Sequence, residues 1–184
     1  MSTYQPKINP DNPAPPEILR QIIAVPVDYV DYDGNRQRAD VEVNEAVADD
    51  VKAFFARALE MRFPIEKIVK SSDAAYMWDD GRLVEDNASS SFNYRVIKGT
   101  DRVSAHGWGT ALDINTRTNP YIRYVDGEEI CEPEGAVYDP TAKGALTTDH
   151  PLVLLLKGRG WLWGGDWTRD ADLMIDYQHF EKRL

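Results

Sequence analysis

The sequence has a single cysteine, Cys131, among its 184 residues. One thiol cannot form a disulfide within the chain, so a disulfide-stabilised framework is excluded, and so is a zinc ribbon built from several cysteines. Histidine is almost as rare, with three in the whole chain. A metal site in this protein must therefore combine histidine with carboxylate ligands.

Positive charge is also scarce, because 21 lysines and arginines stand against 31 aspartates and glutamates. A broad cationic surface is therefore not available, and we expect no nucleic-acid partner. No apolar run is long enough to span a bilayer, which predicts no membrane insertion. The first twenty residues contain five prolines and lack the apolar core of a signal peptide, so we expect a cytoplasmic protein, with export by another route left open.

The length and the hydrophobic content of 42% predict one compact domain. Residues 1–16 are polar and rich in proline, which indicates an extended N-terminal arm. Residues 17–184 are then the folded domain. We expect the protein to be a monomer.

The N-terminal part of the domain predicts a β-hairpin followed by a helix. Residues 22–30 and 39–43 favour strands and flank Asp33-Gly34, a strong two-residue turn signal. Asn44 can cap a helix over 45–61, in which apolar residues recur at helical spacing on one face. That face is expected to cover the sheet.

The rest of the domain predicts short elements separated by irregular segments. Further strands are expected at 65–69, 111–115 and 177–182. Two segments without periodicity are interpreted as mostly irregular, 71–91 and 116–148. A helix with Pro151 in its first turn is expected to end at Gly158. Strands and helices segregate, so the predicted fold class is α+β, with a mainly antiparallel sheet and helices packed on one face.

A histidine and an aspartate stand seven residues apart in the segment SAHGWGTALDIN, residues 104–115. The two glycines between His106 and Asp113 let the backbone turn. On the strand that follows, the period of two sends Leu112 and Ile114 to one face and Asp113 to the other. The pattern predicts an apolar floor that presents the Asp113 carboxylate on its opposite side.

A second pair, Asp176 and His179, lies near the C-terminus in DYQHFE, residues 176–181. In a flat strand, residues three apart point to opposite faces. We therefore expect Asp176 on a loop or turn just before the last strand, so that both side chains converge while Phe180 anchors the strand. A catalytic zinc ion typically has three protein ligands and an open fourth position, and two histidines with one aspartate satisfy that count.

The pattern S-x-H-x-x-G-x-A-x-D, followed far downstream by a carboxylate-x-x-H-F, resembles the D-alanyl-D-alanine carboxypeptidase family of metallopeptidases. That family includes VanY, VanX-type dipeptidases and the phage L-alanyl-D-glutamate endopeptidases. The similarity extends to SFNYR at 91–95, NPY at 119–121 and GWLWGGDW at 160–167. These segments occur in the order expected for the family.

The resemblance implies that His106, Asp113 and His179 are the ligands of one zinc ion per chain. Asp176 stands where the family has its general base. Arg95 matches an arginine of the family, which is expected to hold a substrate carboxylate or to polarise the scissile carbonyl.

Several residues near the motifs also have ordinary structural interpretations. A structural salt bridge is the alternative for Arg95. Ser104 is expected to hydrogen-bond near the ligand loop or the substrate, with a simple turn role as the alternative. We expect Trp163 and Trp167 to pack in the core rather than wall the cleft. His150 is interpreted as a helix-cap residue. Asp166 is interpreted as a turn aspartate, with a hydrogen bond to a ligand imidazole as the alternative.

The activity implied by the resemblance is hydrolysis of peptidoglycan stem peptides at a zinc site in a cleft on the sheet, with the cell wall as the place of action. We expect a D-alanyl-D-alanine carboxypeptidase, because Arg95 could read a free terminal carboxylate. Aspartate rather than glutamate at position 176 favours the alternative, an endolysin-like L-alanyl-D-glutamate endopeptidase. A non-catalytic zinc-binding module of the hedgehog type is a further alternative, and the carboxylate at 176 argues against it.

Overall fold

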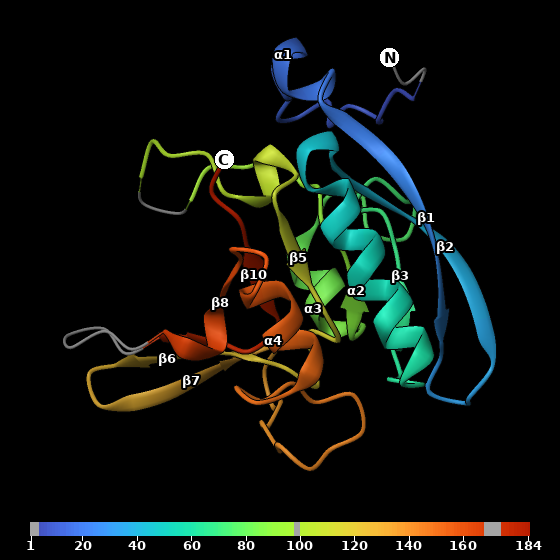
Figure 1. Cartoon of the computed structure of the whole chain (residues 1–184). Helices are drawn as coiled ribbons and strands as arrows, with labels where there is room; N and C mark the ends of the chain where they lie inside the picture. Colours follow the sequence, from blue (N-terminus) through green and yellow to red (C-terminus); the bar gives the residue numbers. More distant parts are fainter. Residues whose placement is uncertain (1–3, 98–99, 168–173) are drawn as a thin grey trace.

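The computed structural model describes residues 4–97, 100–167 and 174–184. These residues form an α+β fold, as predicted, in which short helices accompany several small sheets (Figure 1). The expectation of one mainly antiparallel sheet is wrong in detail, since the described strands form four separate sheets and one of the four is a parallel pair. In the described ranges, no helix is long and apolar enough to cross a membrane.

The predicted hairpin is present and is the longest strand pair among the described residues, but residues 31–35 join its strands instead of the two-residue turn expected at Asp33-Gly34. β1 (Ile22–Val30) and β2 (Arg36–Asn44) run antiparallel with Ile22 opposite Asn44. At the end of β2 the Asn44 side chain accepts a hydrogen bond from the Ala46 amide, which satisfies a free donor of the next helical turn. The chain then continues through η1 (Glu45–Val47) into α2 (Ala48–Glu60), so the predicted cap and helix are confirmed.

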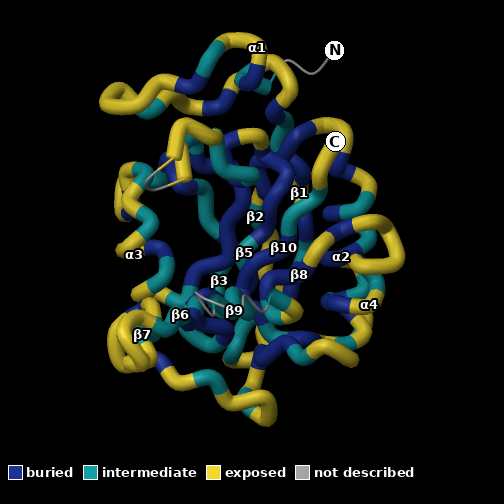
Figure 2. Tube along the Cα trace, turned by 90° about the vertical axis from the view of Figure 1, so that its left-hand side faces the viewer, coloured by how far each residue is buried: buried dark blue, intermediate teal, exposed yellow. Residues whose placement is uncertain are grey.

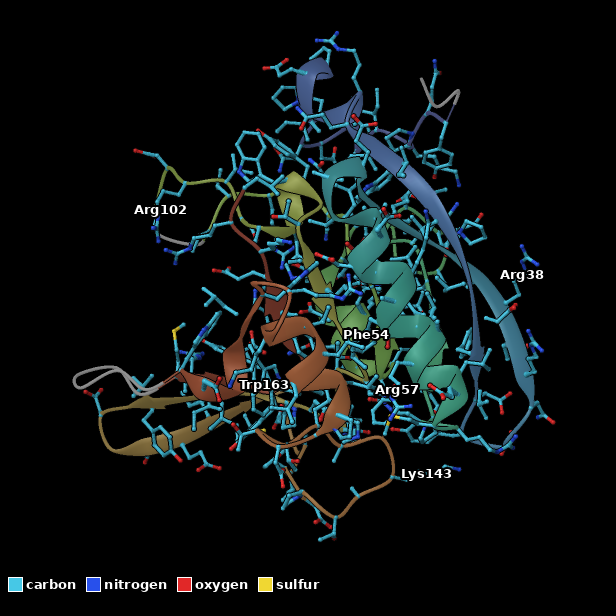
Figure 3. All side chains as sticks on the ribbon, in the orientation of Figure 1. Arg38, Phe54, Arg57, Arg102, Lys143 and Trp163 are labelled. Atoms are coloured by element: carbon cyan, nitrogen blue, oxygen red, sulfur yellow. The ribbon has the colours of Figure 1, made fainter. Side chains whose placement is uncertain are left out.

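The main core lies between α2, the hairpin and the sheet that carries the C-terminal strand. Phe54 is fully buried, and its ring lies 5.9 Å from the ring of Phe180. α4 (Pro151–Lys157) packs beside α2, and Trp163 is buried in the same cluster (Figure 3). The burial pattern in Figure 2 shows the same arrangement, with buried strands inside and exposed loops outside.

A three-stranded antiparallel sheet of order β5-β10-β8 joins the two sequence motifs. β5 (Ala111–Asp113) pairs with β10 (His179–Glu181), and β10 pairs with β8 (Leu162–Trp163). The register places Asp113 directly opposite His179. Directly opposed residues of an antiparallel pair point to the same face, so these two side chains meet.

The segment 71–91 is not the long loop that was expected. It contains α3 (Asp80–Glu85) and β4 (Ala88–Ser89), and β4 pairs in parallel with the short strand β3 (Lys67–Ile68). The Asp79 carboxylate caps α3 by accepting a hydrogen bond from the Arg82 amide. A six-residue helix is too short to show an apolar periodicity, which explains why the pattern missed it.

The segment 116–148 also contains regular structure that was not expected. β6 (Tyr121–Val125) and β7 (Glu128–Glu132) form a hairpin whose turn residues, Asp126 and Gly127, both have positive φ, as in a type I′ turn. β9 (Met174–Asp176) adds to the other edge of β6. The charged residues of this hairpin obscured an ordinary Asp-Gly turn signal.

The helix expected near Pro151 is α4, and the His150 ring accepts a hydrogen bond from the Leu152 amide at its start. His150 therefore has the cap role that was interpreted for it. The N-terminal arm, residues 4–15, has no regular secondary structure and leads into α1 (Pro16–Leu19) at the top of Figure 1.

Phe54→Ala should lower the free energy of unfolding by about 3–5 kcal/mol, because the truncation leaves a cavity between α2 and β10. Chemical denaturation measures the loss. Lys52→Ala, an exposed position on the same helix, serves as the control and should change stability by less than about 0.5 kcal/mol. A loss below about 1 kcal/mol for Phe54→Ala would contradict the described core.

Candidate metal centre

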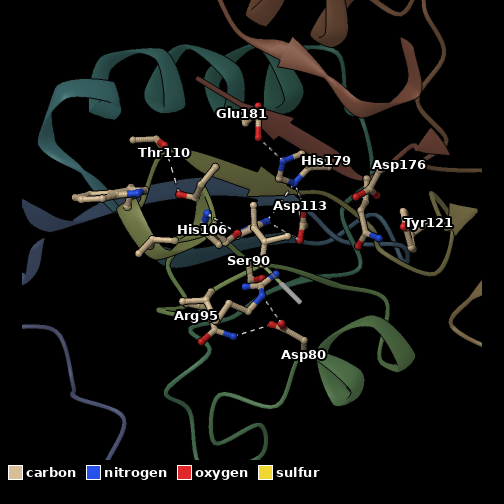
Figure 4. A pocket seen from close by; sticks show the side chains of 18 of the residues that line it. Asp80, Ser90, Arg95, His106, Thr110, Asp113, Tyr121, Asp176, His179 and Glu181 are labelled. Carbon is tan, nitrogen blue, oxygen red and sulfur yellow. Dashed lines mark hydrogen bonds and ion pairs between the residues drawn. The ribbon is translucent and has the colours of Figure 1, made fainter. Parts of the chain in front are cut away.

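Three side chains from three different elements converge at one end of β5 (Figure 4). His106 begins η2 (His106–Trp108), Asp113 ends β5, and His179 begins β10. Gly109 follows η2 with a φ of 67°, and its left-handed conformation turns the chain from η2 into β5. Of the two glycines between His106 and Asp113, Gly109 thus has the expected turning role, whereas Gly107 lies within η2.

The ligand atoms of these residues lie close to one another. His106 Nε2 is 3.1 Å from His179 Nδ1 and 3.2 Å from Asp113 Oδ2, and His179 Nδ1 is 3.0 Å from Asp113 Oδ1. Two atoms that each bind a tetrahedral zinc ion at about 2.0–2.1 Å are roughly 3.3 Å apart. The spacing and the nitrogen and oxygen donors therefore fit a small cation such as zinc.

The far side of each imidazole ring is held by a protein acceptor. His106 Nδ1 lies 2.7 Å from the Ser91 carbonyl oxygen, to which it donates, and His179 Nε2 lies 3.4 Å from Glu181 Oε2. His106 Nε2 and His179 Nδ1 are then the nitrogens that face Asp113 and would bind a metal ion. Glu181 was missed from the sequence, although the period of two along β10 places it on the same face as His179.

Electrostatics within the cluster favour a bound cation. Burial alone would raise the pKa of Asp113, but the charges and hydrogen bonds of His106 and His179 outweigh burial and hold that pKa well below its usual range. Burial would lower the pKa of His179, yet hydrogen bonds to Asp113 and Glu181 outweigh it and raise the pKa to about 10. The site thus stabilises a positive charge between these side chains, and a metal ion can replace the proton that supplies this charge.

Asp176 lies beside this cluster but is the last residue of β9, rather than on the loop or turn that was expected. Two residues, Tyr177 and Gln178, separate it from β10, and this short connection lets Asp176 and His179 face the same pocket. Pairing of β9 with β6 places Asp176 opposite Tyr121.

The surroundings of Asp176 are unusually tight. A Cβ atom at Gly164 would lie 2.8 Å from the Asp176 Cβ, so only glycine permits this approach. Among the described contacts, Asp176 Oδ1 is buried and has no hydrogen-bond partner. Burial raises the pKa of Asp176 to about 7, while His179, Gln178 and Arg95 oppose that rise. A carboxyl group with these properties can accept and release a proton near neutral pH.

Arg95 lines the same pocket, and its Nε donates to Asp80 Oδ2 of α3 at 2.7 Å (Figure 4). The Arg95 side chain is 35% exposed, so the ion pair and contact with a ligand are compatible. Asp80 was not predicted as a site residue. It also accepts a hydrogen bond from Asn93 Nδ2 at 2.6 Å, which fixes its orientation.

Ser104 occupies a turn next to the first ligand. Its Oγ accepts a hydrogen bond from the His106 amide at 3.3 Å, and its own amide donates to the Arg95 carbonyl at 2.9 Å. Ser104 thus has the local turn contacts that were the alternative to substrate binding, and it also lines the pocket.

The tryptophans and Asp166 have distinct positions. Trp163 is buried, and its Nε1 donates to the Tyr177 carbonyl, as expected for a core residue. Trp167 lines the pocket with its ring 5.3 Å from the His179 ring, so the expectation that it packs in the core is wrong. Asp166 contacts Thr148 and Lys157 instead of a ligand histidine.

One family model matches the chain in the comparisons with known proteins. The family model described as D-alanyl-D-alanine carboxypeptidase matches residues 98–182, a range that contains His106, Asp113, Asp176 and His179. Neither the search of curated proteins nor the search of solved structures found a match. The match confirms the resemblance seen in the sequence motifs, and residues 98–182 are similar to the D-alanyl-D-alanine carboxypeptidase family.

Proposed function

We propose that the protein is a zinc-dependent peptidase that hydrolyses peptidoglycan stem peptides, with His106, Asp113 and His179 as the zinc ligands. The observation that carries the proposal is the convergence of two imidazole nitrogens and one carboxylate within bonding range of a single ion, next to the half-buried Asp176, whose Oδ1 is buried. The family match supports the same class of reaction.

The residues around the ligands have separate tasks in this proposal. Zinc, when bound, would lower the pKa of a water molecule and polarise the scissile carbonyl. Asp176 takes the proton of the attacking water and then gives it to the leaving amine, for which a pKa near neutrality is well suited. Ser91 and Glu181 hold the two rings in the required orientation.

Arg95 supports the finer proposal of a carboxypeptidase. Asp80 engages Arg95 Nε, and the half-buried Arg95 side chain lines the pocket, where its guanidinium group can meet a ligand. Paired donors of a guanidinium group match a free carboxylate, such as the C-terminus of a peptide ending in D-alanyl-D-alanine. The stem peptide is accordingly the proposed partner.

Cleavage between L-alanine and D-glutamate is the second candidate, and aspartate at position 176 favours it. Digestion of purified muropeptides by the zinc-loaded protein, followed by mass spectrometry, separates the two. Loss of one alanine supports the carboxypeptidase, whereas release of a stem peptide that begins at D-glutamate supports the endopeptidase. If every muropeptide stays intact, the protein is not a peptidase of this class, and a non-catalytic zinc-binding module becomes the better account.

Purified protein should contain about one zinc ion per chain, and His106→Ala should lose most of it, because a two-ligand site binds zinc weakly. Metal analysis after dialysis measures the content. His150→Ala is the matched control, since His150 caps α4 and lies outside the cluster. Full zinc content in a His106→Ala, His179→Ala double variant would rule out the proposed site.

Asp176→Asn should bind zinc nearly as well as the parent but hydrolyse muropeptides slower by a factor on the order of 10² or more, because the amide cannot accept the proton. The parent rate should fall as the pH drops below the pKa of Asp176, since protonation removes the base. That acidic limb should be absent from the variant. A bound cation favours the carboxylate, so the limb will lie below the value of about 7 that burial gives without metal.

Asp166→Asn is the matched control for this test, because Asp166 contacts Thr148 and Lys157 away from the ligands. It should leave the rate within about twofold of the parent, as surface substitutions usually have small effects. Parental activity of Asp176→Asn would show that Asp176 is not the base. Loss of zinc from that variant would instead make Asp176 a ligand.

Arg95→Lys should lower kcat/KM about tenfold or more, because one ammonium group cannot make two parallel hydrogen bonds to a carboxylate. The melting temperature should barely change, since a partly exposed ion pair contributes little stability. Arg82→Lys is the control, as Arg82 pairs with Asp79 outside the pocket. An Arg95→Lys protein that unfolds readily but is fully active while folded would make Arg95 purely structural.

A further inference from the structure

The N-terminal arm lies against a segment that supplies two parts of the candidate site. Residues 91–95 carry the Ser91 carbonyl, which accepts a hydrogen bond from the His106 ring, and the Arg95 side chain. Both the arm and this segment precede residues 98–182, the range matched by the family model. The contacts between them are therefore a feature of this chain that the family match does not describe.

The arm is fixed to the domain at both ends. Near its start, the Tyr4 hydroxyl donates to the buried Glu42 carboxylate, and the Glu42 carbonyl accepts a hydrogen bond from the Phe92 amide at 3.1 Å. Near its end, Ala14 is buried in a small apolar cluster with Ile18, Ile22 and Phe92. Residues of the arm and of the 91–95 segment thus share one packing unit.

Between these two anchors, Asn12 contacts the residue next to Arg95. Asn12 Nδ2 donates to the Tyr94 carbonyl oxygen at 2.9 Å, and the Tyr94 side chain packs against the same apolar cluster. Ile22 of that cluster also packs closely against Gly109, the residue that ends the turn carrying His106. The apolar cluster consequently contacts both residues 91–95 and the turn that carries His106.

We propose that the arm positions Arg95, with Asn12 as the positioning residue. Asp80 holds the guanidinium end of Arg95, and the Ser104 amide donates to its carbonyl oxygen. The hydrogen bond from Asn12 fixes the peptide group immediately before it. A long side chain keeps its charged end in place only when its backbone is also held, because small displacements of a binding group are costly in catalysis. The role given to Arg95 here rests on the proposed function.

The test compares Asn12→Ala with Asn9→Ala in the full-length, zinc-loaded protein. Asn9 is a matched control because its side chain accepts a hydrogen bond from the Asp11 amide, a contact within the arm itself. Hydrogen exchange of the Ser104 amide, which is bonded to the Arg95 carbonyl, should accelerate about three- to tenfold in Asn12→Ala and stay unchanged in Asn9→Ala.

The same variants are then assayed on a synthetic stem pentapeptide ending in D-alanyl-D-alanine. Asn12→Ala should lower kcat/KM about three- to tenfold with unchanged zinc content, and this loss should disappear in an Arg95→Lys background, because Asn12 acts through Arg95. An equal loss in both backgrounds would overturn the link to Arg95. Unchanged Ser104 exchange in Asn12→Ala would overturn the positioning role itself.

The two proposals fail in different ways in this experiment. A parent protein that cleaves neither the pentapeptide nor muropeptides would refute the proposed function, while Ser104 exchange would still decide whether the arm holds the segment. A parent that is active but responds equally to Asn12→Ala and Asn9→Ala would refute the positioning role and leave the peptidase proposal intact.

Discussion

The approach of two buried imidazole nitrogens to within 3.1 Å, beside the Asp113 carboxylate, is the constraint on which the site depends. Two nitrogen lone pairs this close would repel each other, so a proton or a metal ion must lie between them, and the raised pKa of His179 favours a proton there in the absence of metal. Three features of the fold hold these groups together. His179 lies opposite Asp113 in the sheet, and Gly109 turns the chain from η2 into β5. The Ser91 carbonyl accepts a hydrogen bond from the His106 ring and so fixes its orientation. A zinc ion that replaced this proton would bond to both nitrogens and to the Asp113 carboxylate.

A second constraint keeps the base next to the ligands without making it one of them. Asp176 and His179 belong to different sheets, β9 to the β7-β6-β9 sheet and β10 to the β5-β10-β8 sheet. The two-residue connection between the strands turns both side chains into one pocket, and Gly164 allows the backbone of Asp176 to pass close by. The resulting burial raises the pKa of Asp176, the change that a proton acceptor and donor requires.

The features that the sequence predicts correctly are those determined by interactions between residues close together in the chain. The hairpin, α2 and α4 follow from β-favouring residues on both sides of Asp33-Gly34, a capping Asn44 and a proline at a helix start, all of which act over a few residues. The motif residues likewise mark the ligand cluster. The partners of those residues are harder to find, because Ser91, Asp80 and Gly164 come near the site only through pairing and packing across the chain. Glu181 is the exception, since strand periodicity alone places it beside His179.

The central claim is that one zinc ion lies between His106, Asp113 and His179. X-ray absorption at the zinc edge of the loaded protein tests it most directly, because the first-shell distances report the ligand types. The account predicts a four-coordinate ion with two imidazole nitrogens and oxygen ligands, at about 2.0–2.2 Å. A shell made only of oxygen atoms, or one that contains sulfur from Cys131, would contradict it.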